Sequence, residues 1–112
     1  GGDVEAMVEC TRVLGNISNK NDGREWIESH RVDEACLVLL GHEDHRIVYN
    51  CFGIILNLTA ADHCRLVEDA ELCSHLLEWT SKFHLLDVSE DGSDAAQIST
   101  VVEKILLNLS DL

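Results

Sequence analysis

The motif Leu14-Gly15-Asn16-Ile17-Ser18 returns as Ile55-Leu56-Asn57-Leu58-Thr59 and again as Leu106-Leu107-Asn108-Leu109-Ser110. In each copy an asparagine lies between apolar residues and is followed two positions later by a hydroxyl side chain. The first two asparagines are 41 residues apart and the last two are 51 apart. The chain therefore has an internal repeat of about 40 residues, with an insertion of about ten residues in its last copy.

Apolar residues before each motif recur at steps of three and four residues, as in Ile47, Val48, Cys51, Ile54 and Ile55. This spacing predicts a long amphipathic helix that each motif closes, preceded in a complete repeat by a short helix and a medium one. The polar segment Asp87-Val88-Ser89-Glu90-Asp91-Gly92-Ser93 is typical of a surface loop and accounts for the insertion. We expect the chain to begin with the third helix of one repeat, at 3–18. A full repeat follows at 21–60, with helices near 23–29, 32–40 and 44–60. A second full repeat occupies 61–112, with helices near 62–69, 70–83 and 94–110 and the inserted loop near 84–93.

Composition supports an all-α protein. Proline is absent, aromatic residues are scarce and 46% of the 112 residues are apolar, which favours long helices over strands. Small helical units of this size bury their apolar faces by stacking, so we predict a solenoid of about two and a third repeats. The five cysteines have no paired spacing, which argues against a disulfide framework.

The charge of the chain restricts its partners. Asp and Glu number 21 against 8 Lys and Arg, for a formal net charge of −13. Such a field repels nucleic acid and anionic membranes. The sequence contains neither a long apolar run nor a signal-peptide pattern, so we expect a cytoplasmic protein.

A short, a medium and a long helix in about 40 residues, with the third closing on the asparagine motif, resembles the armadillo repeat. The resemblance covers essentially the whole chain. It implies a right-handed superhelix of helices with a concave face that binds a protein or an extended peptide. The glycine usual between the first two helices is replaced around Ser29-His30 and Asp69-Ala70.

A narrower resemblance rests on the segments Cys10 to Ser18 and Cys51 to Thr59, which look like the armadillo repeat-containing protein 2 family. That family is associated with cilia and flagella. The resemblance implies a role in assembling or transporting axonemal components.

Third helices line the concave surface of armadillo proteins, and the asparagine of the closing motif binds the backbone of an extended peptide there. Asn16, Asn57 and Asn108 match it. A primary amide suits this role because it offers both a donor and an acceptor. We predict a partner-binding stripe of seven residues on the third helices: Asn16, Asn57, Asn108, Arg12, Arg46, Asn50 and Lys104.

Two alternatives to this stripe stay open. The asparagines can instead bond carbonyl groups of their own repeats, and the polar stripe can be an ordinary solvated helix surface. Peptide-binding relatives often carry tryptophan one turn before the asparagine, where this chain has Arg12, Gly53 and Lys104. The cations favour an acidic or neutral peptide, and nuclear-import cargo is a poor fit.

Further expectations concern the ends and the aromatic residues. Trp26 and Trp79 are expected in the core. Open solenoid ends expose apolar helix faces, which allows self-association. A purely structural segment of a longer solenoid is the alternative function.

The sequence indicates neither catalysis nor a cofactor. It has no nucleophile elbow, phosphate-binding glycine loop or zinc-protease helix. A zinc module could draw only on His63-Cys64 and Cys73-Ser74-His75, whose spacing is wrong for a zinc knuckle. We predict a protein-interaction scaffold that is not an enzyme and holds no metal.

Overall fold

Six helices form the parts of the chain that the computed structural model describes, which are residues 2–61, 64, 66, 69–85 and 94–110. None of these residues lies in a β-strand, which confirms the all-α prediction. The helices are α1 (Gly2–Ile17), α2 (Asn21–Ser29), α3 (Val32–Leu39), α4 (His45–Thr59), α5 (Ala70–Leu85) and α6 (Asp94–Ser110). Within the described residues, none of these helices is long and apolar enough to cross a membrane.

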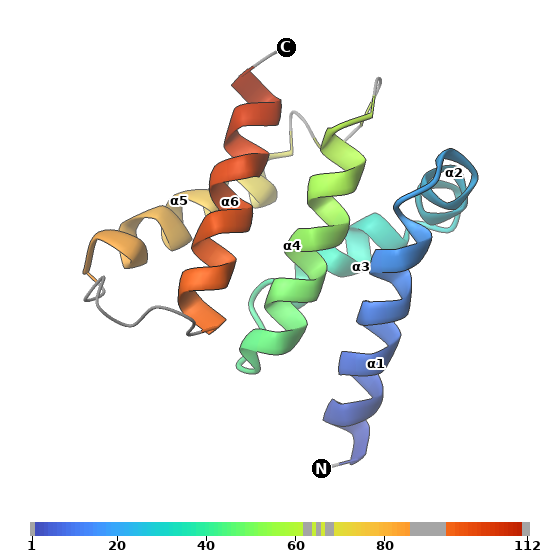
Figure 1. Ribbon diagram of the computed structural model, residues 1–112, viewed down its shortest axis with the longest axis horizontal. Coiled ribbons are helices and arrows are strands. Elements are labelled where there is room, and N and C mark those ends of the chain that lie inside the picture. The colour runs from blue at the N-terminus through green and yellow to red at the C-terminus, as the bar shows by residue number, and fades with distance from the viewer. Residues whose placement is uncertain (1, 62–63, 65, 67–68, 86–93, 111–112) are drawn as a thin grey trace.

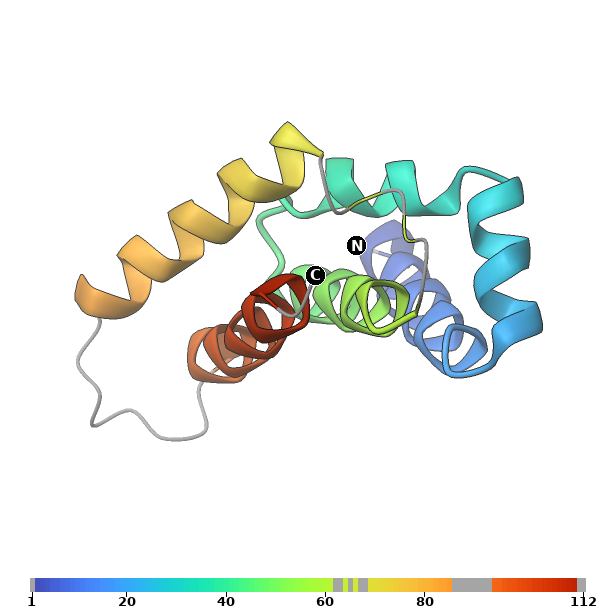
Figure 2. The same cartoon turned by 90° about the horizontal axis from the view of Figure 1, so that it is seen from above.

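The three long helices that end in the repeated motif lie side by side. Figure 1 shows α1, α4 and α6 running in the same direction, with α4 in the middle. Seen from above, α5, α3 and α2 form an outer arc, and α1, α4 and α6 lie on its inner side (Figure 2). The third helices thus form one layer of an armadillo-like stack, whose concave side is the side turned away from the arc.

The core lies between the two layers and is centred on α4. Its Ile47, Val48, Cys51, Phe52, Ile54, Ile55 and Leu58 are all fully buried. These positions form two series with steps of three and four residues, 47, 51, 54, 58 and 48, 52, 55. Together they surround much of the helix, because α4 packs on α1, α3 and α6 at once. Trp79 of α5 closes one end of this core edge-on to Phe52, with ring centroids 6.5 Å apart.

A glycine allows the tight connection between α1 and α2. A Cβ atom at Gly23 would lie 1.9 Å from the carbonyl oxygen of Ile17, closer than any side chain can approach. Arg24 then reaches back, and its Nη1 donates to the carbonyl of Ser18 at 3.0 Å. Gly23 and Arg24 together hold α2, the first helix of a repeat, against the end of α1, the third helix of the repeat before it.

The predicted helix bounds match the observed ones closely, with some differences. The loop expected near 84–93 begins later, because α5 continues to Leu85; residues 86–93 lie outside the described part of the chain. So does most of the short helix expected near 62–69. Trp79 is buried as expected, but the prediction of a core position for Trp26 was wrong. Trp26 is 46% exposed and stacks on His30 at a centroid distance of 4.5 Å, since α2 lies at the edge of the layer.

Candidate protein-interaction face

The predicted stripe residues come from one face of each third helix. Their spacing of four, three and four residues places them on a single side of a helix. On α4 the stripe comprises Arg46, Asn50, Gly53 and Asn57, and the repeat period relates each of these to a residue of α1 and a residue of α6. These equivalent positions add Glu5, Glu9, Gly53, Gln97 and Val101 to the seven predicted residues. From this point the stripe means all twelve: Glu5, Glu9, Arg12 and Asn16; Arg46, Asn50, Gly53 and Asn57; Gln97, Val101, Lys104 and Asn108.

The asparagines of the closing motif connect successive repeats. Asn57 Nδ2 donates to Ser18 Oγ at 2.8 Å and to Asn19 Oδ1 at 3.1 Å. Asn108 Nδ2 donates in the same manner to Thr59 Oγ1 and to the carbonyl of Leu56, both at 3.3 Å. Ser18 and Thr59 hold equivalent places in the motif, so the two contacts are successive rungs of one ladder.

The hydroxyl groups of the ladder are oriented to accept. Ser18 Oγ donates its proton to the carbonyl of Gly15 at 2.7 Å, and Thr59 Oγ1 donates to that of Leu56 at 3.1 Å. Ser110 Oγ does the same to Leu107 at 2.8 Å. With its single proton directed to the carbonyl three residues back, each oxygen presents only lone pairs to the next repeat.

The ladder limits what these asparagines can offer a partner. An amide has two N–H donors and one carbonyl acceptor. Both donor contacts of Asn57 go to the preceding repeat, as do those of Asn108. What remains is Oδ1, an acceptor. Asn16 is different: it is exposed, and its side chain makes no hydrogen bond within the described residues.

A second contact lies two turns earlier on α4. Asn50 Nδ2 donates to the carbonyl of Val8 at 3.1 Å and to Thr11 Oγ1 at 3.0 Å. The Thr11 hydroxyl in turn donates to the carbonyl of Met7 at 2.8 Å. Thr11 is buried and Asn50 half-buried, so this pair satisfies polar groups that would otherwise be stranded between the two helices.

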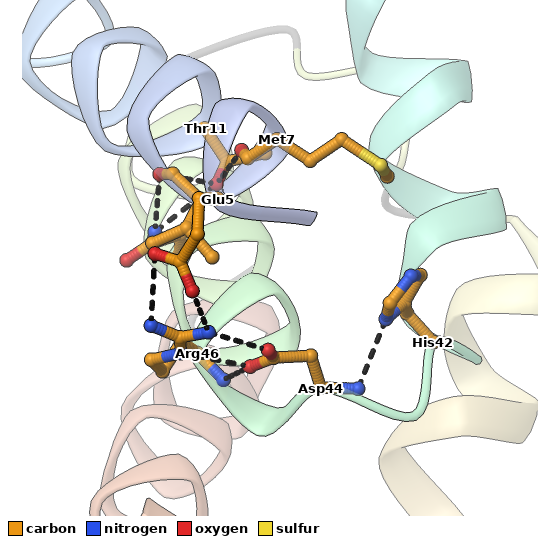
Figure 3. A network of polar contacts seen from close by, with 8 residues as sticks. Glu5, Met7, Thr11, His42, Asp44 and Arg46 are labelled. Atoms are coloured by element: carbon orange, nitrogen blue, oxygen red, sulfur yellow. Dashed lines mark hydrogen bonds and ion pairs between the residues drawn. The ribbon is translucent and has the colours of Figure 1, made fainter. Parts of the chain in front are cut away.

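Arg46 makes the third contact between α4 and α1 (Figure 3). Its guanidinium binds both carboxylate oxygens of Glu5, at 2.9 and 3.3 Å, and reaches Asp44 Oδ2 at 2.7 Å. Asp44 also caps α4, because its Oδ1 accepts from the backbone N–H of Arg46 at 2.9 Å. Hydrogen bonds from Arg46 lower the pKa of Asp44 from 3.8 to about 2, and they lower the pKa of Glu5 as well.

The row formed by Arg12, Gly53 and Lys104 is the most open part of the stripe. Arg12 and Lys104 are exposed, and nothing lies within 4 Å of where a Cβ of Gly53 would be. Arg12 pairs with Glu9 of its own helix at 3.0 Å, in an exposed contact of the kind that contributes little to stability. Bare backbone of α4 is therefore flanked by a cation on each neighbouring helix.

The seven predicted residues thus divide into two groups. Arg46, Asn50, Asn57 and Asn108 make contacts between third helices, and Arg12, Asn16 and Lys104 remain exposed. The sequence reasoning missed Ser18 and Thr59 as the acceptors. A signal was available, since a hydroxyl occupies the same place in all three motifs.

No metal site arises among the described residues, where no three His, Cys, Asp or Glu side chains come together to hold an ion. Of the residues considered for zinc, Cys64 is buried, Cys73 is exposed, and His63 lies outside the described part of the chain. All five cysteines are free thiols. Cys36 donates to or accepts from Cys51 in the core, and this contact together with burial raises the pKa of Cys51.

Known proteins resemble this chain over nearly its full length. Armadillo repeat-containing protein 2 of Bos taurus is 28% identical over 110 residues, that of Homo sapiens 27% and that of Mus musculus 28%. Each match covers 97% of this chain and 12% of the relative, so the chain spans about an eighth of the length of these relatives. The resemblance read from the repeated motifs is confirmed. No family model and no solved structure matches the chain.

Proposed function

We propose that this chain is a non-catalytic protein-interaction segment of the armadillo type, which binds an extended peptide or a protein partner across α1, α4 and α6. The observation that carries the proposal is the layer of three parallel third helices on the inner side of the fold, with polar groups in register along it. Its armadillo relatives support a protein partner in general terms.

The contacts within the stripe indicate which partner chemistry fits. Asn57 and Asn108 offer carbonyl oxygens, because their N–H groups are bonded within the chain. An extended peptide would therefore donate its own N–H groups to these oxygens. A peptide carboxylate would lie near Gly53, between the cations of Arg12 and Lys104. The net charge of −13 opposes a strongly acidic peptide, so a neutral peptide with one carboxylate fits best.

The test uses a variant that fills the face without disturbing the fold. Gly53→Glu places a side chain in open space on a helix and reverses the local charge, and replacing a helical glycine favours the helix. Peptides selected from a display library on the wild-type chain should lose binding to Gly53→Glu. The matched control is Val38→Glu, which adds the same charge at an exposed apolar position of α3, on the outer layer.

The outcome also separates this function from the alternative, a segment that only lends rigidity to a longer solenoid. If selected peptides bind Gly53→Glu as well as they bind the wild type, or if both Glu variants weaken binding equally, the inner face is not the binding site. Circular dichroism of each variant shows whether its helices are intact.

The axonemal role is a further proposal, which rests on the resemblance to the ciliary armadillo family. Under this proposal the protein acts in the cytoplasm and in cilia or flagella. Isolated axonemes should then retain the wild-type chain and release Gly53→Glu on washing. Equal retention of the two, or of neither, would argue against this role.

A further inference from the structure

The middle helix of the third-helix layer exposes a single face. α4 lies between α1 and α6, so both of its sides are covered within this chain (Figure 1). From residue 46 to residue 57, the residues of α4 that are not buried share the side turned away from the core: Arg46, Tyr49, Asn50, Gly53, Leu56 and Asn57. The arginine and the two asparagines bond to α1 or to the residues that follow it. Tyr49, Gly53 and Leu56 remain as the part of this face that makes no such contact.

Tyr49 is the exposed aromatic side chain of the third helices. Its side chain is 39% exposed, whereas Phe52, the other aromatic residue of α4, is fully buried. The sequences of α1 and α6 contain no aromatic residue, and the repeat places Val8 and Thr100 at the positions equivalent to Tyr49. The Tyr49 hydroxyl makes no hydrogen bond within the described residues. An aromatic ring is therefore open to a partner at the middle of the inner face.

Gly53 leaves the space beside this ring empty. Residues four apart are neighbours on a helix surface, so a side chain at position 53 would lie against Tyr49 and cover part of its ring. Nothing lies within 4 Å of where a Cβ of Gly53 would be. Leu56, half-buried, follows on the other side of the glycine. The ring and the bare backbone thus form a flat apolar surface on which a second flat side chain can lie.

The charges around this surface indicate what accompanies the flat side chain. Arg12 and Lys104 are exposed at the positions equivalent to Gly53 on the two neighbouring helices. Two cations favour a carboxylate between them. The rows of Tyr49 and Gly53 are one helical turn apart, about 6 Å along the axis. Two residues of an extended peptide span about 7 Å, so one short segment can place a side chain in each row.

We propose that Tyr49 determines the side-chain preference of the inner face. An aromatic side chain of the bound peptide stacks on the Tyr49 ring over Gly53, about two residues from the carboxylate that lies between Arg12 and Lys104. This inference rests on the proposed function, because it requires a peptide on the inner face. It adds a requirement for an aromatic residue, which the asparagines cannot impose because they contact peptide backbone.

Parallel selection of displayed random peptides on the wild-type chain and on Tyr49→Ala tests the preference. The wild type should enrich Phe, Tyr or Trp near an Asp or Glu, and Tyr49→Ala should keep only the acidic residue. Fluorescence anisotropy then measures a double-mutant cycle between Tyr49→Ala and an alanine replacement of the peptide's aromatic residue. Each change alone should weaken binding about tenfold, and both together hardly more, because either removes the same contact. Tyr49→Phe should bind like the wild type.

Two further variants complete the test. Leu77→Ala is the matched control, because it removes a side chain 69% exposed on α5, in the outer layer, and should leave binding unchanged. Tyr49→Leu keeps an apolar side chain at the site and should also lose the preference for aromatic residues, so the test does not depend on the stability of Tyr49→Ala. Circular dichroism shows whether each variant is folded.

The outcomes separate this inference from the proposed function. Peptides that lose binding to Gly53→Glu but show no aromatic preference, or that bind Tyr49→Leu as tightly as the wild type, would overturn the inference and leave the proposed function standing. Losses that multiply in the double-mutant cycle would also overturn it, because the peptide's aromatic residue would then lie elsewhere. Peptides that bind Gly53→Glu as tightly as the wild type would overturn both.

Discussion

An asparagine on a helix surface can face a ligand or the neighbouring helix, and its hydrogen bonds decide which. In Asn57 both N–H contacts go to the end of the preceding repeat, to Ser18 and Asn19. Asn108 repeats the arrangement with Thr59. The residue type that is expected to bind peptide in armadillo proteins therefore also holds the stack together here. Only its carbonyl oxygen is left for a partner.

This division of roles predicts different costs for the same substitution at two equivalent sites. Asn57→Ala removes two hydrogen bonds and leaves the oxygen of Ser18, a buried residue, without its donor, which should lower the free energy of unfolding by about 1–2 kcal/mol. Asn16→Ala is the matched control, because Asn16 is exposed and makes no such bond in the described residues; it should change stability by less than about 0.5 kcal/mol. Urea denaturation measures both. An equal loss of stability in the two variants would contradict the hydrogen bonds between Asn57 and the preceding repeat.

The Arg46 cluster predicts a dependence on pH. Because Arg46 lowers the pKa of Asp44 to about 2 and that of Glu5 below 4.5, the two carboxylates favour the folded state when ionised. Their contribution is complete above the unfolded pKa values and is lost as pH falls through the folded ones. Arg46→Gln should be less stable than the wild type near neutral pH, and the difference should shrink between about pH 5 and pH 2. A difference that is constant over this range would count against the cluster.

At the scale of helices, glycine has opposite effects at two positions. Gly23 lies where α2 meets the end of α1, with no room for a Cβ beside the Ile17 carbonyl. Gly53 lies in the middle of α4, where a Cβ would point into open space. The first glycine is required by packing, while the second keeps the inner face bare.

Substituting alanine at both sites tests this difference. Gly23→Ala should destabilise the fold by about 1–3 kcal/mol, because α2 must move away from the end of α1. Gly53→Ala should stabilise it by about 1 kcal/mol through helix propensity. Thermal unfolding followed by circular dichroism shows whether each substitution raises or lowers the melting temperature. A stabilising effect at Gly23 would mean that the α1–α2 connection is looser than described.

The helices could be predicted from the sequence because their signals are local. Apolar spacing and the repeated motif predicted α1, α4 and α6 to within a few residues of the observed bounds. Contacts between helices depend on the distance and the angle between neighbouring repeats. No local sequence pattern specifies these two quantities. For that reason the residues of the stripe do lie on α1, α4 and α6, but the acceptors Ser18 and Thr59 were missed and Trp26 was expected inside.

Over the whole molecule, burial divides the cysteines into two classes. Cys10 and Cys73 are exposed, whereas Cys36, Cys51 and Cys64 are buried in the core. A thiol reagent should modify two of the five thiols quickly in the native chain and all five in denaturant, because reaction requires an accessible thiolate. Mass spectrometry of the labelled chain identifies the sites. Fast labelling of Cys51 would mean that the core around α4 opens readily.

Across the whole molecule, the third helices are joined from one repeat to the next through the asparagine and hydroxyl of the closing motif. NMR tests this most directly, through nuclear Overhauser effects from the side-chain amides of Asn57 and Asn108. We expect cross-peaks from Asn57 to Ser18 and from Asn108 to Thr59, with slower solvent exchange for both amides than for that of Asn16. Absence of these cross-peaks, with all three amides exchanging at the same rate, would contradict the account.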